Sequence, residues 1–244
     1  MSKTLAFLAS ILVTLLIYNS ASLPSFSESQ QTLIVARAID GDTLETEDGR
    51  KIRLVNINTP EKGKKGYNEA KAYLQQLEHS PVEFEFLGQD RYSRYLARAY
   101  TDEYVNEEII KKGLGTIFLV QDSETKKFSK TQEEAIENSR GIWKKSQYYN
   151  CFKTQIDAQE EFVELTNTCA EINLDSWILK DESRKEYTFY DLELGEITIH
   201  TKKGKDSESE LFWNSEQNVW NNDRDTLLLL DKNGDIAHYD SYGY

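Results

Sequence analysis

The sequence predicts a mainly β protein composed of two domains, and two observations carry this prediction. Short runs of alternating or β-branched residues, bounded by polar turns, recur along most of the chain, and Val82 to Phe86 alternates strictly between apolar and acidic residues. The charge also changes near residue 150: residues 31–149 hold 19 Lys and Arg against 20 Asp and Glu, whereas residues 150–244 hold 9 against 21. A chain of 244 residues is long enough for two modest domains.

The first 30 residues have the features of a secretory signal. Lys3 precedes an uncharged, mainly apolar run from Leu5 to Tyr18, and small residues over 19–22 offer a cleavage site. The run is short for a membrane span, although an uncleaved anchor remains the alternative. We therefore expect a signal peptide over residues 1–22 and a secreted mature chain without a membrane span.

The stretch Ile39 to Glu61 is predicted to form a β-hairpin. A strand over Thr43–Thr46 is followed by a turn over Glu47–Gly49, and Lys51–Ile57 returns as the second strand. A hairpin brings its two ends together, so we expect the residues on either side of it to form one site.

The side chains at these two ends combine oxygen ligands, a further carboxylate and a fixed cation. Asp42, Asn58 and the Thr59 carbonyl would supply hard oxygen ligands of the kind that Ca²⁺ prefers. Glu61 would orient or deprotonate a water molecule. Arg53 projects from the returning strand as a fixed cation.

Three motifs support a resemblance to a known family. They are Asp40-Gly41-Asp42-Thr43, then Arg53 to Glu61 ending in Thr-Pro-Glu, then Asp90-Arg91-Tyr92-Ser93-Arg94. In this order they resemble the staphylococcal-type thermonucleases over roughly residues 32–145.

This resemblance implies a five-stranded Greek-key barrel of the OB-fold type with three helices. It also implies a Ca²⁺-dependent endonuclease that cuts DNA and RNA and leaves 3′-phosphate products. By the same resemblance Arg53, Glu61 and Arg94 are catalytic, Asp42, Asn58 and Thr59 hold the metal ion, and Asp40 lies in its outer shell. The chain departs from the family twice, because Asn58 stands where the family has aspartate and Ser93 where it has glycine.

Further residues beside the site have two interpretations each. Lys62, Lys64 and Lys65 are predicted to bind or steer the phosphates of the substrate, or they belong to a solvated loop. Tyr92 is predicted to stack or hydrogen-bond at the substrate, with a core tyrosine as the alternative.

Three helices are expected in the first domain. Helical spacing of apolar residues predicts one over Asn68–His79, a glycine stop ends a second over Val105–Lys112, and a third covers Phe128–Ser139. Residues 144–150 form the expected linker to the second domain.

Residues 151–244 are predicted to form a β-sandwich. Seven short strands are separated by polar turns, and Asn233-Gly234 is a strong hairpin signal between the last two. The runs Phe162–Asn167 and Leu174–Leu179, with Trp220–Leu229, resemble the lamin-tail domain. That resemblance implies an immunoglobulin-like fold that binds or tethers, so we expect attachment to another macromolecule or to a cell envelope. The acidic charge of this half argues against binding of nucleic acid through phosphates.

Cys151 and Cys169 are predicted to form a disulfide. In an antiparallel hairpin facing residues are equidistant from the turn, and this pair is centred on residue 160, inside the expected turn. An exported protein would meet the oxidising conditions that the bond requires, and two unpaired cysteines are the alternative. Taken together, the sequence predicts a secreted monomeric endonuclease with a tethering domain, and the competing hypothesis is a non-catalytic binding protein with a decayed site.

Overall fold

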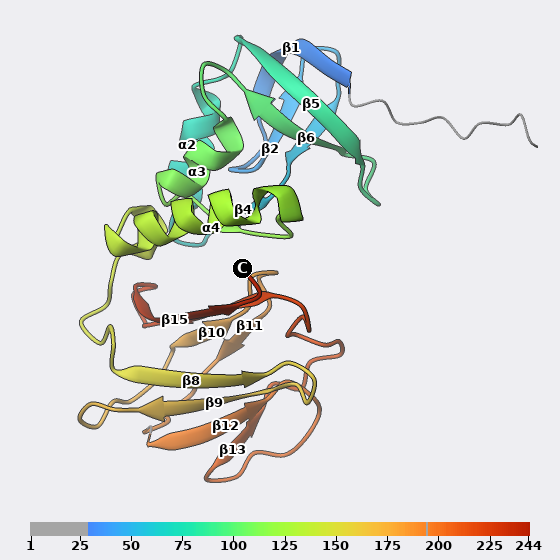
Figure 1. Cartoon of the computed structure of the whole chain (residues 1–244). Helices are drawn as coiled ribbons and strands as arrows, with labels where there is room; N and C mark the ends of the chain where they lie inside the picture. Colours follow the sequence, from blue (N-terminus) through green and yellow to red (C-terminus); the bar gives the residue numbers. More distant parts are fainter. Residues whose placement is uncertain (1–28, 194) are drawn as a thin grey trace, which may run out of the picture.

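The computed structural model describes residues 29–193 and 195–244, which form a β-barrel domain followed by a β-sandwich (Figure 1). The predicted signal peptide over residues 1–22 lies outside the described residues. Within the described ranges, no helix is long and apolar enough to cross a membrane.

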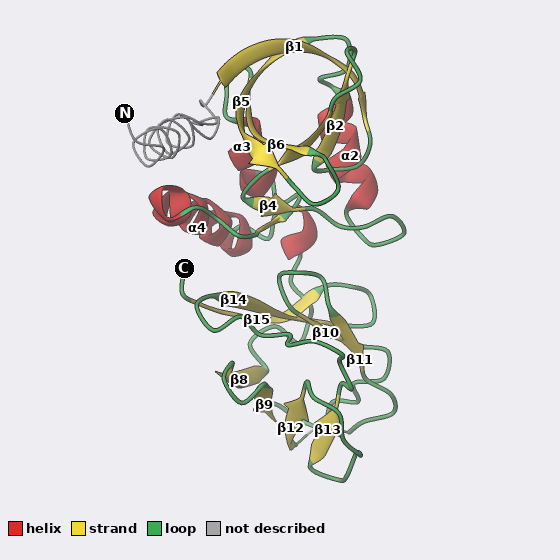
Figure 2. Ribbon diagram, turned by 90° about the vertical axis from the view of Figure 1, so that its right-hand side faces the viewer, coloured by secondary structure: helices red, strands yellow, loops and turns green. Residues whose placement is uncertain are grey.

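The first domain is a closed five-stranded barrel, seen along its axis in Figure 2, which confirms the predicted fold. Its strands follow one another around the barrel in the order β1-β2-β3-β6-β5, and only β3 and β6 run parallel to each other. A small sheet of β4 and β7 lies beside it. The strands are β1 (Ser29–Ala38), β2 (Thr43–Thr46), β3 (Lys51–Leu54), β4 (Ile57–Asn58), β5 (Pro81–Gln89), β6 (Tyr95–Tyr100) and β7 (Thr116–Ile117).

Alternation along these strands fills the barrel. Val82, Phe84 and Phe86 of β5 are buried, and they pack with Leu44 of β2 and Ile52 of β3 in one hydrophobic cluster. The acidic residues between them face outward because successive side chains of a strand point to opposite faces.

Three α-helices lie in the described part of the barrel domain, as predicted. They are α2 (Tyr67–Gln75), α3 (Val105–Lys111) and α4 (Asp122–Glu137), and a 3₁₀ turn, η1 (Gly141–Trp143), follows. Helix α4 begins six residues earlier than the predicted Phe128, because Asp122 and Glu124 place acidic side chains in its first turn. It lies between the barrel and the sandwich (Figure 1).

The second domain is a sandwich of two four-stranded sheets, in agreement with the predicted architecture. One sheet has the order β11-β10-β14-β15 and the other β13-β12-β9-β8. The sequence predicted seven strands; the additional one is β13, which pairs in parallel with β12. The strands are β8 (Phe152–Asp157), β9 (Phe162–Asn167), β10 (Ile178–Lys180), β11 (Glu186–Thr188), β12 (Glu196–His200), β13 (Glu210–Phe212), β14 (Asp225–Leu230) and β15 (Ile236–Tyr242).

The predicted disulfide is present between Cys151 and Cys169, whose Cα atoms are 5.2 Å apart. The hairpin register pairs Phe152 with Asn167, so Cys151 faces Thr168. Cys169 is the next residue after Thr168, and its sulfur bonds to that of Cys151. The bond therefore closes the open end of the β8–β9 hairpin, as expected.

The two domains share an apolar contact. Trp143 of η1 and Ile136 of α4 pack against Leu228 of β14 and Ile236 of β15, and all four are buried. This cluster places the β10–β11 end of the sandwich against the barrel domain beside β4.

Candidate active site

The β2–β3 hairpin positions the first half of the candidate site. Thr43 pairs with Arg53 across the hairpin, and the backbone N–H of Leu54 donates to the carbonyl of Asp42 over 2.9 Å. Strand β4 then carries Asn58 back beside Asp42. The hairpin thus brings together Asp42, Arg53 and Asn58, as the sequence predicted.

Asp42 is buried and fully engaged by neighbouring donors. Its Oδ2 accepts from the backbone N–H of Thr59 at 3.0 Å and from the Thr59 hydroxyl at 3.2 Å, and its Oδ1 accepts from the Thr43 hydroxyl at 3.1 Å. Gly41 makes this approach possible, because a Cβ there would lie 2.6 Å from the Thr59 hydroxyl oxygen. Asp40 accepts from the backbone N–H of Asp42 at 3.0 Å, which places it just behind the site.

Arg53 is the central cation of the site. Its Nε lies 3.3 Å from Asp42 Oδ1, and its Nη2 donates to Asn58 Oδ1 at 2.6 Å and to the Ile57 carbonyl at 2.7 Å. Burial lowers the pKa of Arg53, the Asp42 carboxylate opposes that effect, and the nearby Arg184 and Arg94 lower the pKa further. Three arginines therefore converge on one small region.

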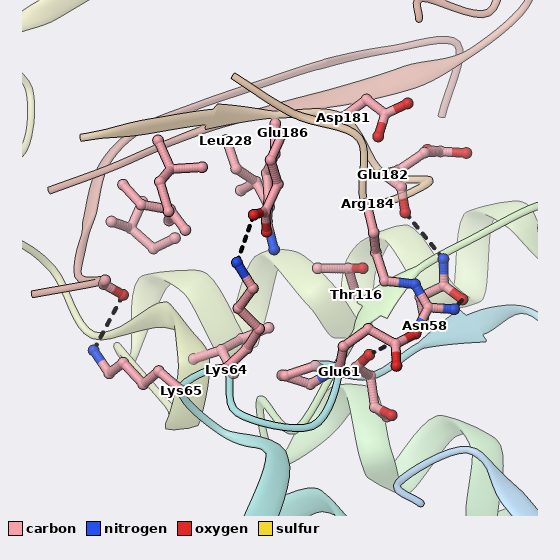
Figure 3. A pocket seen from close by; sticks show the side chains of 18 residues that line it. Asn58, Glu61, Lys64, Lys65, Thr116, Asp181, Glu182, Arg184, Glu186 and Leu228 are labelled. Atoms are coloured by element: carbon pink, nitrogen blue, oxygen red, sulfur yellow. Dashed lines mark hydrogen bonds and ion pairs between the residues drawn. The ribbon is translucent and has the colours of Figure 1, made fainter. Parts of the chain in front are cut away.

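Arg184 reaches this region from the second domain, and the sequence analysis missed it. It lies in the turn between β10 and β11, and its Nη2 donates to Asn58 Oδ1 at 3.0 Å (Figure 3). Its Nη1 donates to the Thr59 carbonyl at 3.3 Å and forms an ion pair with Glu61 Oε1. Arg184 lies 123 residues after Glu61. It belongs to a polar turn, Asp-Glu-Ser-Arg-Lys, in which the adjacent cations Arg184 and Lys185 are the sequence feature that could have indicated a role at the site.

The neighbouring Glu182 completes the contact between the domains. Its backbone carbonyl accepts from Asn58 Nδ2 at 3.0 Å, and its Oε2 accepts from the Tyr244 hydroxyl at 2.5 Å. Burial raises the pKa of Glu182 to about 8, with Asp225 and Asp181 adding to the effect. This carboxyl is therefore mainly protonated at neutral pH.

Arg94 is held beside the site by the loop between β5 and β6. Its Nε donates to Asp90 Oδ2 at 2.7 Å, and Asp90 Oδ1 accepts from the backbone N–H groups of Tyr92 and Arg94. Ser93, at the position of the family glycine, has φ 62° in the left-handed region. Tyr92 is 65 % exposed, so its side chain belongs to the surface.

The predicted lysines divide into two groups. Lys62 is exposed. Lys64 forms an ion pair with Glu186 of the sandwich at 2.6 Å, and Lys65 donates to the Gly234 carbonyl at 3.2 Å and pairs with Asp235. These last two face a cavity of about 240 Å³ between the domains, drawn in Figure 3.

Comparison with known proteins agrees with this geometry. Residues 51–145 match the model of the staphylococcal nuclease homologue family, and residues 150–244 match that of the lamin tail domain. An uncharacterised endonuclease of Escherichia coli O157:H7 and one of Escherichia coli are each 33% identical to the chain over 116 residues, which is 45% of this chain and 74% of each relative. The chain belongs to the staphylococcal nuclease homologue family. A lamin tail domain follows its nuclease homologue domain.

Staphylococcal nuclease homologues generally use Ca²⁺, and the donor set of this chain fits that ion by chemistry. Asp42, Asn58 and Thr59 present a carboxylate, an amide and a carbonyl oxygen, and cationic N–H groups of Arg53 and Arg184 already lie among them. Within residues 29–193 and 195–244, however, no three His, Cys, Asp or Glu side chains gather as a metal site. The candidate site thus depends on one carboxylate and two neutral oxygens.

Proposed function

We propose that this protein is a secreted, Ca²⁺-dependent endonuclease that hydrolyses phosphodiester bonds of DNA and RNA, with a lamin tail domain for attachment. The observation that carries the proposal is the position of Arg53 between Asp42 Oδ1 and Asn58 Oδ1. Arg94 is near enough to lower the pKa of Arg53, and Glu61 is linked to Asn58 and Thr59 through Arg184. Membership of the family and the likeness to the two endonucleases support it.

The arginines of the site would bind the phosphate. Arg53 is fixed by Asp42 and the backbone of β4, so its guanidinium needs little reorganisation when charge develops on the phosphoryl oxygens. Arg94, oriented by Asp90, would bind the same group from the β5–β6 loop. Ca²⁺ bound at Asp42, Asn58 and Thr59 would neutralise phosphoryl charge and polarise the P–O bond.

Glu61 would direct the attacking water. Its carboxylate takes a proton from the water as the water oxygen bonds to phosphorus, and the bond from phosphorus to the 5′ oxygen breaks. The 5′ oxygen leaves with the electron pair and takes a proton from solvent water, so the products are a 3′-phosphate and a 5′-hydroxyl. In the structure Glu61 is bound by Arg184, which must withdraw before this step.

Secretion and attachment belong to the same proposal. The Cys151–Cys169 disulfide favours an oxidising compartment, and the excess of carboxylates in residues 150–244 suits a partner other than nucleic acid. We propose a monomer whose sandwich binds another macromolecule or a cell envelope.

Cleavage of labelled single-stranded DNA and RNA, with Ca²⁺ or with a chelator, tests the proposal. The wild-type protein should cut both in Ca²⁺, and Glu61→Gln and Arg94→Ala should each cut about 10²–10⁴-fold more slowly. Exposed Arg37, paired with Glu45 on the barrel surface, supplies the control Arg37→Ala. Binding of nucleic acid without cleavage at any Ca²⁺ concentration would favour the non-catalytic alternative.

A further inference from the structure

Arg184 occupies the oxygens that a metal ion would need. Its guanidinium donates to Asn58 Oδ1 and to the Thr59 carbonyl, and it also neutralises Glu61, the proposed base. Arg53 already engages Asp42 and shares Asn58 Oδ1. In this arrangement every proposed ligand oxygen accepts a hydrogen bond or forms an ion pair, and the two that face the sandwich are held by Arg184.

Asn58 matches this arrangement better than an aspartate would. Its Nδ2 donates to the backbone carbonyl of Glu182 at 3.0 Å, and an aspartate would place a second acceptor against that carbonyl. Asparagine also carries one negative charge less than aspartate, as a guanidinium carries one positive charge less than Ca²⁺. One of the two residues that depart from the family pattern, Asn58, is thus contacted by the docked sandwich.

The sandwich also neutralises cations that would bind phosphates. Glu186 pairs with Lys64 at 2.6 Å, and Asp235 pairs with both Lys65 and Lys144, the latter at 2.8 Å. The carboxylates of an acidic domain therefore lie where the phosphates of a bound strand would lie.

We propose that the lamin tail domain is an intramolecular inhibitor of the nuclease site, in which Arg184 takes the place of the metal ion and the carboxylates take the place of substrate phosphates. This inference rests on the function proposed above, because it assigns regulation to the same site. The turn over residues 181–185, which carries Arg184, is named the latch.

The latch is ordered by its own contacts. Asp181 Oδ1 accepts from the backbone N–H of Lys185 at 2.7 Å, and Asp181 Oδ2 accepts from the Ser183 hydroxyl at 2.5 Å. Arg184 itself has φ 77°, a left-handed conformation that non-glycine residues seldom adopt.

A second contact holds the sandwich closed without touching the site. Arg224 donates to the Val120 carbonyl at 2.7 Å and forms an ion pair with Asp122 at 2.8 Å. Loss of this contact should favour the open state while Arg184 and all site residues are kept.

Closure and metal binding must then be coupled. Because Ca²⁺ and Arg184 compete for the same oxygens, whatever opens the latch raises the affinity for Ca²⁺, and Ca²⁺ opens the latch by the same factor. Coupling of this kind typically changes an affinity about 5–150-fold.

Isothermal titration calorimetry with Ca²⁺ alone tests the inference on the two-domain protein. We compare the wild type with Arg184→Ala and Arg224→Ala, and with Lys203→Ala, which removes one positive charge from an exposed pair with Glu216 on the sandwich. Arg184→Ala should bind Ca²⁺ at least about tenfold more tightly than the wild type. Arg224→Ala should shift in the same direction by a smaller factor, and Lys203→Ala should match the wild type.

Unchanged or weaker Ca²⁺ binding by Arg184→Ala, with circular dichroism like that of the wild type, overturns the inference. A nuclease assay of the same variants separates it from the proposed function. If Arg184→Ala binds Ca²⁺ more tightly but no variant cleaves nucleic acid, the competition between Arg184 and Ca²⁺ is supported and the proposed endonuclease activity is refuted. Slower cleavage by Arg184→Ala at saturating Ca²⁺, with unchanged affinity, would instead make Arg184 part of the catalytic machinery and refute inhibition.

Discussion

Replacement of Arg53 should cost stability as well as activity, which distinguishes it from the other proposed catalytic residues. Arg53 is 7 % exposed and pairs with Asp42, which is 3 % exposed. Removal of one partner of a buried pair costs roughly 3–5 kcal/mol because the other charge stays buried. Asp42 keeps its hydrogen bonds from Thr43 and Thr59, so we expect the lower end, about 3 kcal/mol for Arg53→Ala.

Glu61 provides the matched comparison. Its side chain is 63 % exposed, so Glu61→Gln should change the free energy of unfolding by no more than about 0.5 kcal/mol. For a chain of this size, 3 kcal/mol lowers Tm by roughly 6–12 °C. Arg53→Lys keeps the charge but not the forked donor geometry. Its loss of unfolding free energy should therefore lie between those of Arg53→Ala and Glu61→Gln.

Thermal unfolding followed by circular dichroism, with cleavage rates measured at 20 °C or below, separates the two effects. Both Arg53→Ala and Glu61→Gln should lose most of the cleavage rate, but only the first should lose thermal stability. A Tm for Arg53→Ala within about 2 °C of the wild type would refute the structural role assigned to Arg53.

Three further outcomes are expected. Asn58→Asp should lower the Ca²⁺ concentration for half-maximal cleavage, because it adds a negative ligand and removes the donor to the Glu182 carbonyl; an equal or higher requirement in a Ca²⁺ titration contradicts this. Cys151→Ser with Cys169→Ser should lower the unfolding free energy of the sandwich by about 3 kcal/mol in the chain-entropy model, since the bond spans 18 positions; urea unfolding with and without reductant checks it. Burial lowers the pKa of His238, against the effect of Asp240, so the unfolded chain binds more protons below the ordinary pKa of 6.5. The contribution of His238 to stability should therefore fall as pH drops below that value, whereas the raised pKa of Glu182 acts in the opposite direction over the same range. Between pH 7 and 5.5 the wild type should lose unfolding free energy relative to His238→Gln, measured by urea unfolding.

Local sequence patterns predicted the part of the candidate site that the β2–β3 hairpin brings together. The alternation around the Glu47–Gly49 turn set the register that brings Asp42 to Asn58, and a similar argument paired the two cysteines. Strand β13 was missed because Glu210–Phe212 is short, follows a polar run and gains its order only from parallel pairing with β12.

The contribution of the second domain could not be predicted in this way. Arg184 is brought to Asn58 by the packing of Trp143 against Leu228 and Ile236, which no periodicity in the sequence encodes. The excess of carboxylates after residue 150 was visible, but the positions of Glu186 and Asp235 opposite two lysines depend on the same packing.

The short connection between η1 and β8 fixes how strongly the latch competes. Only residues 144–151 separate these elements, and short linkers give effective concentrations in the millimolar range. Dilution cannot release an inhibitor that is attached to its own target. The fraction of molecules in which the latch occupies the site should therefore be the same at nanomolar and micromolar protein concentrations. The ratio of an activating ligand's concentration to its dissociation constant must instead exceed the same ratio for the tethered latch. This favours a long strand, which binds tightly by engaging many cations at once, over a single nucleotide.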